Sequence, residues 1–151
     1  MIALLQRVSS SRVTVSGSVI GGIDAGLLVL VGVEAGDTEA IAAKLLHKIS
    51  CYRIFADENG KMNLSLLDAG GGLLLVPQFT LTADTGRGLR PGFSKGASAS
   101  EGRQLFDTLV GLASELDCRV ETGQFGADMQ VELINDGPVT FWLQETAPST
   151  G

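Results

Sequence analysis

Histidine and cysteine are scarce in this chain, and their scarcity excludes several kinds of site. One histidine and two cysteines occur among 151 residues, and the cysteines lie far apart, outside any Cys-x-x-Cys pair. A disulfide framework, a zinc site or a bound cofactor is therefore not expected. We predict that Cys51 and Cys118 are small buried apolar groups and that His47 is exposed on a helix and not catalytic. The common catalytic signatures HExxH, GxSxG and GxxxxGK[ST] are missing too.

Long apolar runs and an excess of basic charge are also lacking. The uncharged apolar stretches 26–33 and 70–76 are far shorter than the roughly 20 residues that a membrane helix needs. No secretory signal pattern follows Met1, so we expect a cytoplasmic protein without a membrane span. The net charge of −6 argues against a protein that coats nucleic acid, because such binding depends on many Lys and Arg contacts to phosphates.

The basic residues nevertheless gather in one place. Arg87, Arg90 and Lys95 lie within nine residues that contain no acid. They are candidates for local contact with the phosphates of an RNA. Charge alone is equally consistent with a solvated loop that keeps the chain soluble.

The distribution of apolar and turn-forming residues predicts several strands first and then helices that alternate with strands. Val, Ile and Leu dominate stretches separated by Ser-Gly and Gly-Gly pairs, at 2–8, 12–15, 19–20 and 26–33. Later strands are predicted at 53–55, 73–76, 119–123, 129–134 and 139–144, and a loop or short helix at 62–64. The run 73–76 is continuously apolar, which is typical of a central strand buried on both faces.

Two stretches have helical periodicity. Asp37 is placed to cap a helix over 38–52. Ser98 and Glu101 fit a capping box that begins a second helix, which ends near Asp117.

The stretch 82–97 between these helices has no periodicity, and we interpret it as an ordered functional loop. The whole pattern indicates a single mixed α/β domain over 1–145 with a flexible tail at 146–151.

Two polar segments stand where a sheet protein rarely needs them. Gln78, Phe79 and Thr80 follow the most apolar strand, where an amide, a hydroxyl and backbone N–H groups could converge on one ligand. Backbone N–H groups so placed make an oxyanion hole. By residue type alone, these are ordinary strand residues with Phe79 facing the core.

The second segment is Asn135-Asp136-Gly137-Pro138, followed by Val139-Thr140. Its composition is that of a hairpin turn. The functional alternative is a cis bond between Gly137 and Pro138, which would point both carbonyls the same way and form a rigid acceptor pair.

Together these segments resemble the D-aminoacyl-tRNA deacylase family, whose signatures are Ser-Gln-Phe-Thr-Leu and Asn-x-Gly-Pro-Val-Thr. The second signature is complete, whereas the first has Pro77 in place of Ser. The resemblance extends from Met1 to about Gln144. Other matching stretches are Gln6–Val8, Arg53–Phe55, Lys61–Leu64, Arg90–Pro91, Phe93–Ala97 and Ala127–Val131.

The resemblance implies a fold with strongly curved, largely antiparallel, barrel-like sheets and two main helices. It also implies a homodimer, hydrolysis without a metal, and a tRNA whose terminal adenosine binds near Gln78, Phe79 and Thr80. Gly137 and Pro138 of one subunit would enter the partner's site and reject L-amino acids by clash. Glycine has no side chain to reject, so glycyl-tRNA, including tRNA(Ala) mischarged with glycine, is an expected second substrate.

Two other functions compete with this interpretation. Thr80 could be the covalent nucleophile of an esterase or peptidase, although no His, Lys or free amine lies near it in sequence to act as base. Alternatively, the loop over 82–97 could make the chain a non-enzymatic module that binds tRNA or a protein.

Overall fold

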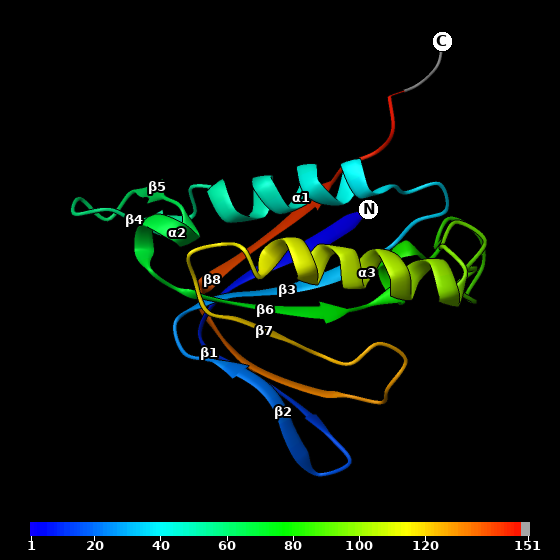
Figure 1. Ribbon diagram of the computed structural model, residues 1–151, viewed down its shortest axis with the longest axis horizontal. Coiled ribbons are helices and arrows are strands. Elements are labelled where there is room, and N and C mark those ends of the chain that lie inside the picture. The colour runs from blue at the N-terminus through cyan, green and yellow to red at the C-terminus, as the bar shows by residue number, and fades with distance from the viewer. Residues whose placement is uncertain (149–151) are drawn as a thin grey trace.

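The computed structural model describes residues 1–148, and its main feature is one mixed sheet with helices on one face (Figure 1). The sheet order is β2-β1-β3-β6-β7, with β8 paired to β1 as well. These strands are β1 (Ile2–Val15), β2 (Ser18–Ile23), β3 (Gly26–Gly32), β6 (Gly72–Pro77), β7 (Val120–Thr122) and β8 (Gln130–Gln144). All pairs made by β1 are antiparallel, whereas β3–β6 and β6–β7 are parallel. The predicted mixed α/β fold is confirmed.

The sheet curls because β1 changes partner along its length. Its first half pairs with β3 from Ile2 to Val8, and its second half pairs with β2 from Ser11 to Val15. The second half carries β2 back towards β7. Gly21 of β2 lies so close to β7 that a Cβ there would be 2.7 Å from the Thr122 carbonyl oxygen. The sheet is therefore nearly closed, as the predicted barrel-like curvature requires.

Helices α1 (Glu39–Cys51) and α3 (Ala99–Ala113) lie on the same face of the sheet (Figure 1). The short helix α2 (Leu66–Ala69) and a small hairpin of β4 (Phe55–Ala56) and β5 (Met62–Leu64) lie beyond one end of the sheet. No helix in the described part of the chain is long and apolar enough to cross a membrane.

The N-terminal cap was predicted correctly for one of the two long helices and wrongly for the other. Ser98 caps α3, because its hydroxyl accepts the Glu101 N–H at 3.3 Å. Thr38 caps α1, so the prediction of Asp37 was wrong. Asp37 is occupied elsewhere, because its carboxylate accepts from the Met1 ammonium at 2.8 Å and from the Glu34 N–H at 2.7 Å.

Side chains alternate across the sheet to form two apolar clusters. In β6, Leu73 and Leu75 join the larger cluster with α1 and α3, whereas Leu74 and Val76 join the smaller cluster on the opposite face. All four are buried, since their relative exposure does not exceed 1%. Because strand side chains alternate with a period of two, the continuously apolar run marks a strand covered on both faces, as predicted.

The predicted hairpin around 135–138 does not exist, because β8 is one strand from Gln130 to Gln144. Two steps along β1, from Gln6 to Val8, correspond to five along β8, from Thr140 to Asn135. The surplus residues leave the ladder as a bulge, which uses the same Asn, Asp, Gly and Pro residues as a turn.

Other boundaries also differ from the predictions. The predicted strands 2–8 and 12–15 are one continuous strand, and 62–64 are a strand and not a loop or helix. α3 ends at Ala113, before the predicted Asp117.

Cys51 is exposed at the end of α1, so the prediction of burial was wrong, whereas His47 is exposed as predicted. Residues 146–148 lack regular secondary structure, and the remainder of the predicted tail lies outside the described residues.

We predict that Gly26→Ala destabilises the fold by at least about 2 kcal/mol, because the added Cβ would overpack two parallel strands. That Cβ would lie 2.0 Å from the Gly72 carbonyl oxygen. The matched control is Gly111→Ala in α3, where nothing apart from the neighbouring backbone of the same helix lies within 4 Å of the added Cβ. The control should gain about 0.5–1 kcal/mol from helix propensity. Urea unfolding at one protein concentration measures both, and equal midpoints for Gly26→Ala and wild type would contradict the prediction.

Candidate functional site

A cavity of about 560 Å³ opens at the carboxyl end of β6, beside the start of α3. Figure 1 shows the arrowhead of β6 and the first turn of α3 at the same end of the molecule. Most of the wall is apolar, and it is formed by Val31, Val33, Val76, Pro77, Phe79, Ala97, Ala99, Gly102, Phe106, Phe125, Gly126, Ala127, Met129 and Val131. Gln78, Ser98 and Asp128 complete it with polar side chains. An apolar hollow with few polar groups is the usual form of a small-ligand site.

The chain turns sharply where β6 reaches this cavity. The Gln78 N–H donates to the Val31 carbonyl oxygen at 2.7 Å, and the next residues form a 3₁₀ turn, η1 (Phe79–Thr82). The buried Thr82 hydroxyl donates to the Phe79 carbonyl oxygen at 2.7 Å. Gly32 of β3 leaves room for the turn, since a Cβ there would lie 3.1 Å from Leu81. Residues 79–81 are therefore a helical turn, and their interpretation as strand residues was wrong.

The start of the turn has backbone donors without partners. The first hydrogen bond of the turn runs from the Leu81 N–H to the Gln78 carbonyl oxygen at 3.3 Å. Within residues 1–148, no acceptor takes the N–H of Phe79 or Thr80, and no side chain caps the turn. These two N–H groups can therefore donate hydrogen bonds to a negatively charged oxygen beside the cavity.

The structure brings together only some of the residues that the sequence singled out. Gln78 and Phe79 line the cavity, and Thr80 lies beside them, with its hydroxyl accepting from the Gln78 amide. Phe79 is 64% exposed, so it does not face the core. Gly137 and Pro138 are absent from the wall of this cavity.

Phe125, Asp128 and Met129 were not predicted as site residues. They come from the segment between β7 and β8, far from β6 in sequence. For Asp128 and Met129 the one available signal was the resemblance of Ala127–Val131 to the family, which assigned no role to their side chains, and Phe125 lies outside that stretch.

The bulge of β8 is held by side chains on both sides of Gly137 and Pro138. Arg7 of β1 donates to the Asp136 carbonyl oxygen at 3.0 Å and to the Ile54 carbonyl oxygen at 2.8 Å. The Asn135 side chain accepts the Val139 N–H at 2.7 Å and donates to the Thr140 hydroxyl at 3.0 Å.

The Gly137–Pro138 peptide bond is cis, as predicted, and both residues are exposed. Both residues of the bulge therefore lie on the surface of the chain.

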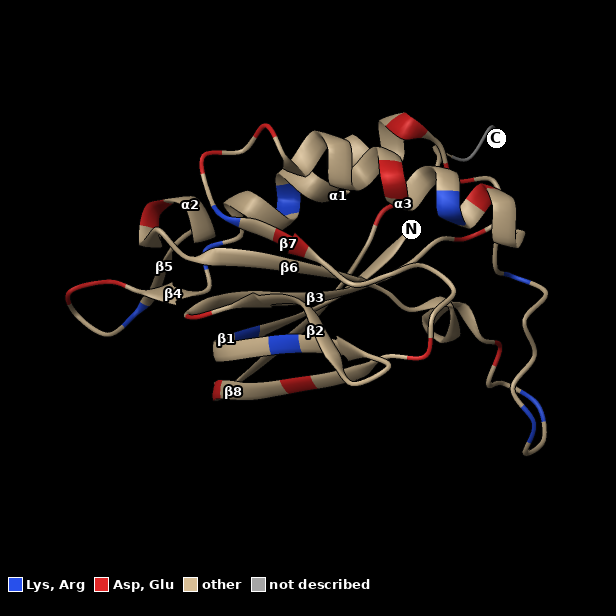
Figure 2. Cartoon of the chain, turned by 60° about the horizontal axis from the view of Figure 1, so that its bottom comes forward, with Lys and Arg blue, Asp and Glu red and all other residues tan. Residues whose placement is uncertain are grey.

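The loop over 82–97 carries the predicted cations outward from the body of the molecule (Figure 2). Arg87 and Arg90 are exposed, and neither forms an ion pair within the described part of the chain. Lys95 differs, because its ammonium lies 3.9 Å from the Asp84 carboxylate. The sequence pattern could not show this pairing, since Asp84 lies outside the acid-free stretch.

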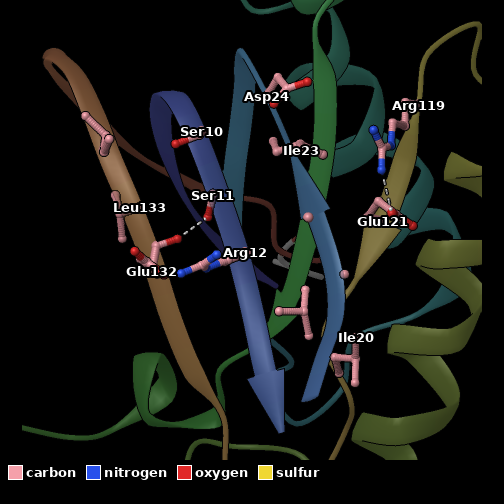
Figure 3. Close-up of a pocket in the computed structure, with 14 residues that line it drawn as sticks. Ser10, Ser11, Arg12, Ile20, Ile23, Asp24, Arg119, Glu121, Glu132 and Leu133 are labelled. Carbon is pink, nitrogen blue, oxygen red and sulfur yellow. Dashed lines mark hydrogen bonds and ion pairs between the residues drawn. The ribbon is translucent and has the colours of Figure 1, made fainter. Parts of the chain in front are cut away.

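A second hollow lies over the strands at the other side of the sheet, and Figure 3 shows its lining. Its cations are already paired with carboxylates: Arg12 with Glu132 at 2.5 Å, and Arg119 with Glu121 at 3.1 Å. Asp24 adds a further negative charge to the wall. The lining of this hollow therefore offers no unpaired cation to a polyanionic ligand.

Metal ligands do not gather in either place. Among residues 1–148, no group of three or more His, Cys, Asp or Glu side chains could hold a metal ion.

Comparisons with known proteins agree over almost the whole chain. The family model described as D-Tyr-tRNA(Tyr) deacylase matches residues 4–144. A D-aminoacyl-tRNA deacylase of Aeromonas hydrophila is 62% identical over 95% of this chain and 99% of its own. One from Thioalkalivibrio sulfidiphilus is 60% identical over 98% and 99% of the two chains.

Two solved structures share the fold. The c-Myc DNA Unwinding Element Binding Protein has a TM-score of 0.92 and 35% identity, over 97% of this chain and 100% of its own. A probable eukaryotic D-amino acid tRNA deacylase has a TM-score of 0.81 at 16% identity, over 94% and 97%, and supports the fold alone. By the family match and the curated relatives, this chain is a member of the D-aminoacyl-tRNA deacylase family, whose enzymes are hydrolases acting on ester bonds.

Proposed function

We propose that this protein is a cytoplasmic editing hydrolase that frees tRNA from D-amino acids by cleaving the ester at the tRNA 3′ end. The family membership sets the reaction class. The observation that carries the site assignment is the pair of free N–H groups on Phe79 and Thr80, beside a largely apolar cavity.

Ester hydrolysis needs a donor for the negative oxygen that forms when water attacks the carbonyl carbon. The N–H groups of Phe79 and Thr80 supply such donors without a metal. The cavity would take the terminal adenosine, whose base fits among Phe125, Met129 and the Gln78 amide. Either the Thr80 hydroxyl or the 2′-hydroxyl of this adenosine assists the attacking water.

We assign the choice of chirality to Gly137 and Pro138 of a partner subunit. Both residues are exposed and lie outside their own subunit's cavity, so a second copy can present them to it. The hydrogen bonds from Arg7 and Asn135 keep the bulge from yielding. A rigid pair of carbonyl acceptors would hold the amino group of a D-amino acid and clash with an L side chain. Glycine would pass, which makes glycyl-tRNA, including mischarged tRNA(Ala), a second substrate.

The geometry favours this scheme over a covalent threonine nucleophile. The Thr80 hydroxyl accepts from the Gln78 amide, and an amide is not a base. A module that only binds tRNA remains the other alternative, and it would be catalytically silent.

The proposed function predicts rapid loss of the ester from D-tyrosyl-tRNA and little loss from L-tyrosyl-tRNA, measured as released radiolabelled amino acid. The D-specific rate should be unchanged by EDTA, because backbone donors stabilise the oxyanion. Equal rates for both enantiomers would contradict the chirality assignment. No rate above the enzyme-free control would favour the binding module, and loss of activity on chelation would replace the backbone mechanism with a metal.

The role of the backbone donors can be separated from that of the phenyl ring. Phe79 is the first residue of η1, a position where proline is tolerated while its N–H is removed. Phe79→Pro should lower kcat by about 10²–10³-fold relative to Phe79→Ala, which loses the ring but keeps the N–H. Single-turnover assays at saturating D-aminoacyl-tRNA measure both. Equal kcat values in the two variants would remove Phe79 from the oxyanion site.

Thr80→Ala tests the Thr80 hydroxyl. This variant should keep much more hydrolytic activity than an enzyme that has lost its covalent nucleophile. A complete loss with normal folding and tRNA binding would instead support the covalent mechanism.

A subunit-mixing experiment tests the cross-subunit assignment. Gly137→Ala should displace the bulge, because its Cβ would lie 2.5 Å from Val139 Cγ2 and 2.6 Å from Val139 N. Mixed with Phe79→Pro, it should recover activity, since one site of each mixed dimer combines an intact turn with an intact bulge. Random exchange in a dimer gives about one quarter of wild-type activity. Neither variant should recover when it is unfolded, refolded and assayed alone. Failure to recover in the mixture would place the bulge and turn in one subunit or outside the mechanism.

A further inference from the structure

Two phenylalanine rings are exposed at the mouth of the β6 cavity, although phenylalanine side chains are usually buried. Phe79 is 64% exposed and Phe93 is 45% exposed. Their ring centroids lie 5.3 Å apart with planes tilted by 54°. Since Phe79 also lines the cavity, the aromatic pair continues directly from the proposed adenosine site onto the outer surface.

The loop that carries Phe93 is held in place by its own hydrogen bonds. Asp84 and Gly92 exchange backbone hydrogen bonds of 2.7 and 3.0 Å across it. The end of the loop is joined to the residues after β3, because the Ala35 N–H donates to the Lys95 carbonyl oxygen at 3.0 Å. Phe93 is therefore presented on an ordered support, so little ordering entropy would be lost when a ligand stacks on it.

Three cations lie on the loop that carries Phe93. Arg87 and Arg90 are exposed and have no carboxylate partner in residues 1–148, whereas Lys95 is paired with Asp84. The loop thus carries two guanidinium groups without carboxylate partners and an exposed ring, in a chain with a net charge of −6. This combination favours a polyanion that also has flat bases. Single-stranded nucleic acid combines these two properties.

We infer that the Phe79–Phe93 pair, with Arg87 and Arg90, binds the unpaired nucleotides that precede the terminal adenosine of the tRNA. The inference rests on the proposed function, because it takes the 3′ end of tRNA as the occupant of the cavity. Bases stack on the exposed ring of Phe93, and the two arginines contact the phosphates that link these bases.

Two probes of different length test this surface. Adenosine 5′-monophosphate reaches the cavity alone, whereas the trinucleotide cytidine-cytidine-adenosine also reaches Phe93. Phe93→Ala should weaken trinucleotide binding by at least about fivefold, the lower limit for losing one stacked base, and leave mononucleotide binding unchanged. Phe93→Tyr should restore trinucleotide binding, because its ring stacks equally well. Titration calorimetry measures both ligands.

The arginines are tested by salt dependence with the same trinucleotide. Each arginine that contacts a phosphate should contribute about 0.7 to the slope of log K against log salt concentration. Arg87→Gln and Arg90→Gln should each lower this slope, whereas Lys61→Gln, at the distant β4–β5 hairpin, should not.

Equal loss of both ligands in Phe93→Ala, no loss of either, or no binding by the wild-type protein would overturn the inference. So would slopes unchanged in both arginine variants. These measurements use nucleotides that carry no esterified amino acid, so they do not depend on hydrolysis. If the wild-type protein binds the trinucleotide through Phe93 but leaves D-tyrosyl-tRNA intact, the proposed hydrolase function is refuted. The inferred nucleotide-binding surface is then still supported.

Discussion

Strand β1 forms backbone hydrogen bonds along both of its edges. The positions of the 3₁₀ turn after β6 and of the bulge in β8 depend on this double pairing. On one edge it pairs with β3, whose Val31 carbonyl oxygen accepts from Gln78 and so fixes where β6 ends and the 3₁₀ turn begins. On the other edge it pairs with β8, which has more residues than β1 can match between Gln6 and Val8. The unmatched residues form the bulge with Gly137 and Pro138. One strand thus sets the positions of both the turn and the bulge.

The sequence predicted features that local chemistry determines and missed those that long-range pairing determines. The apolar run 73–76 and the Ser98 cap follow from neighbouring residues, and both are confirmed. The segment 135–138 has the composition of a turn, but β1 holds its flanks in one strand, so the chain makes a bulge there. Asp37 fits a cap equally well by composition, yet it is bound by the Met1 ammonium from the distant start of the chain.

The candidate site shows the same division. Gln78 and Phe79 could be singled out because polar groups directly follow an apolar strand. The opposite wall, with Phe125 and Met129, could not be found in this way, because it is placed there by the path of the chain between β7 and β8. The exposure of Phe79 was also hidden, since a phenylalanine after a buried strand is expected to face the core. The 3₁₀ turn reverses that expectation and frees the two N–H groups.

The charge distribution constrains how an acidic protein can use an RNA substrate. With a net charge of −6, the body of the chain repels most of a polyanion, whereas the loop with Arg87 and Arg90 attracts a short part of it. Binding to the duplex regions of RNA is thereby disfavoured relative to binding at a flexible end. An editing enzyme benefits from this arrangement, because its substrates differ at the ester bond and not in the folded part of the tRNA. Under the proposed function, weak contact with the rest of the tRNA would leave discrimination to the few groups around Phe79 and to the bulge proposed to come from a partner subunit.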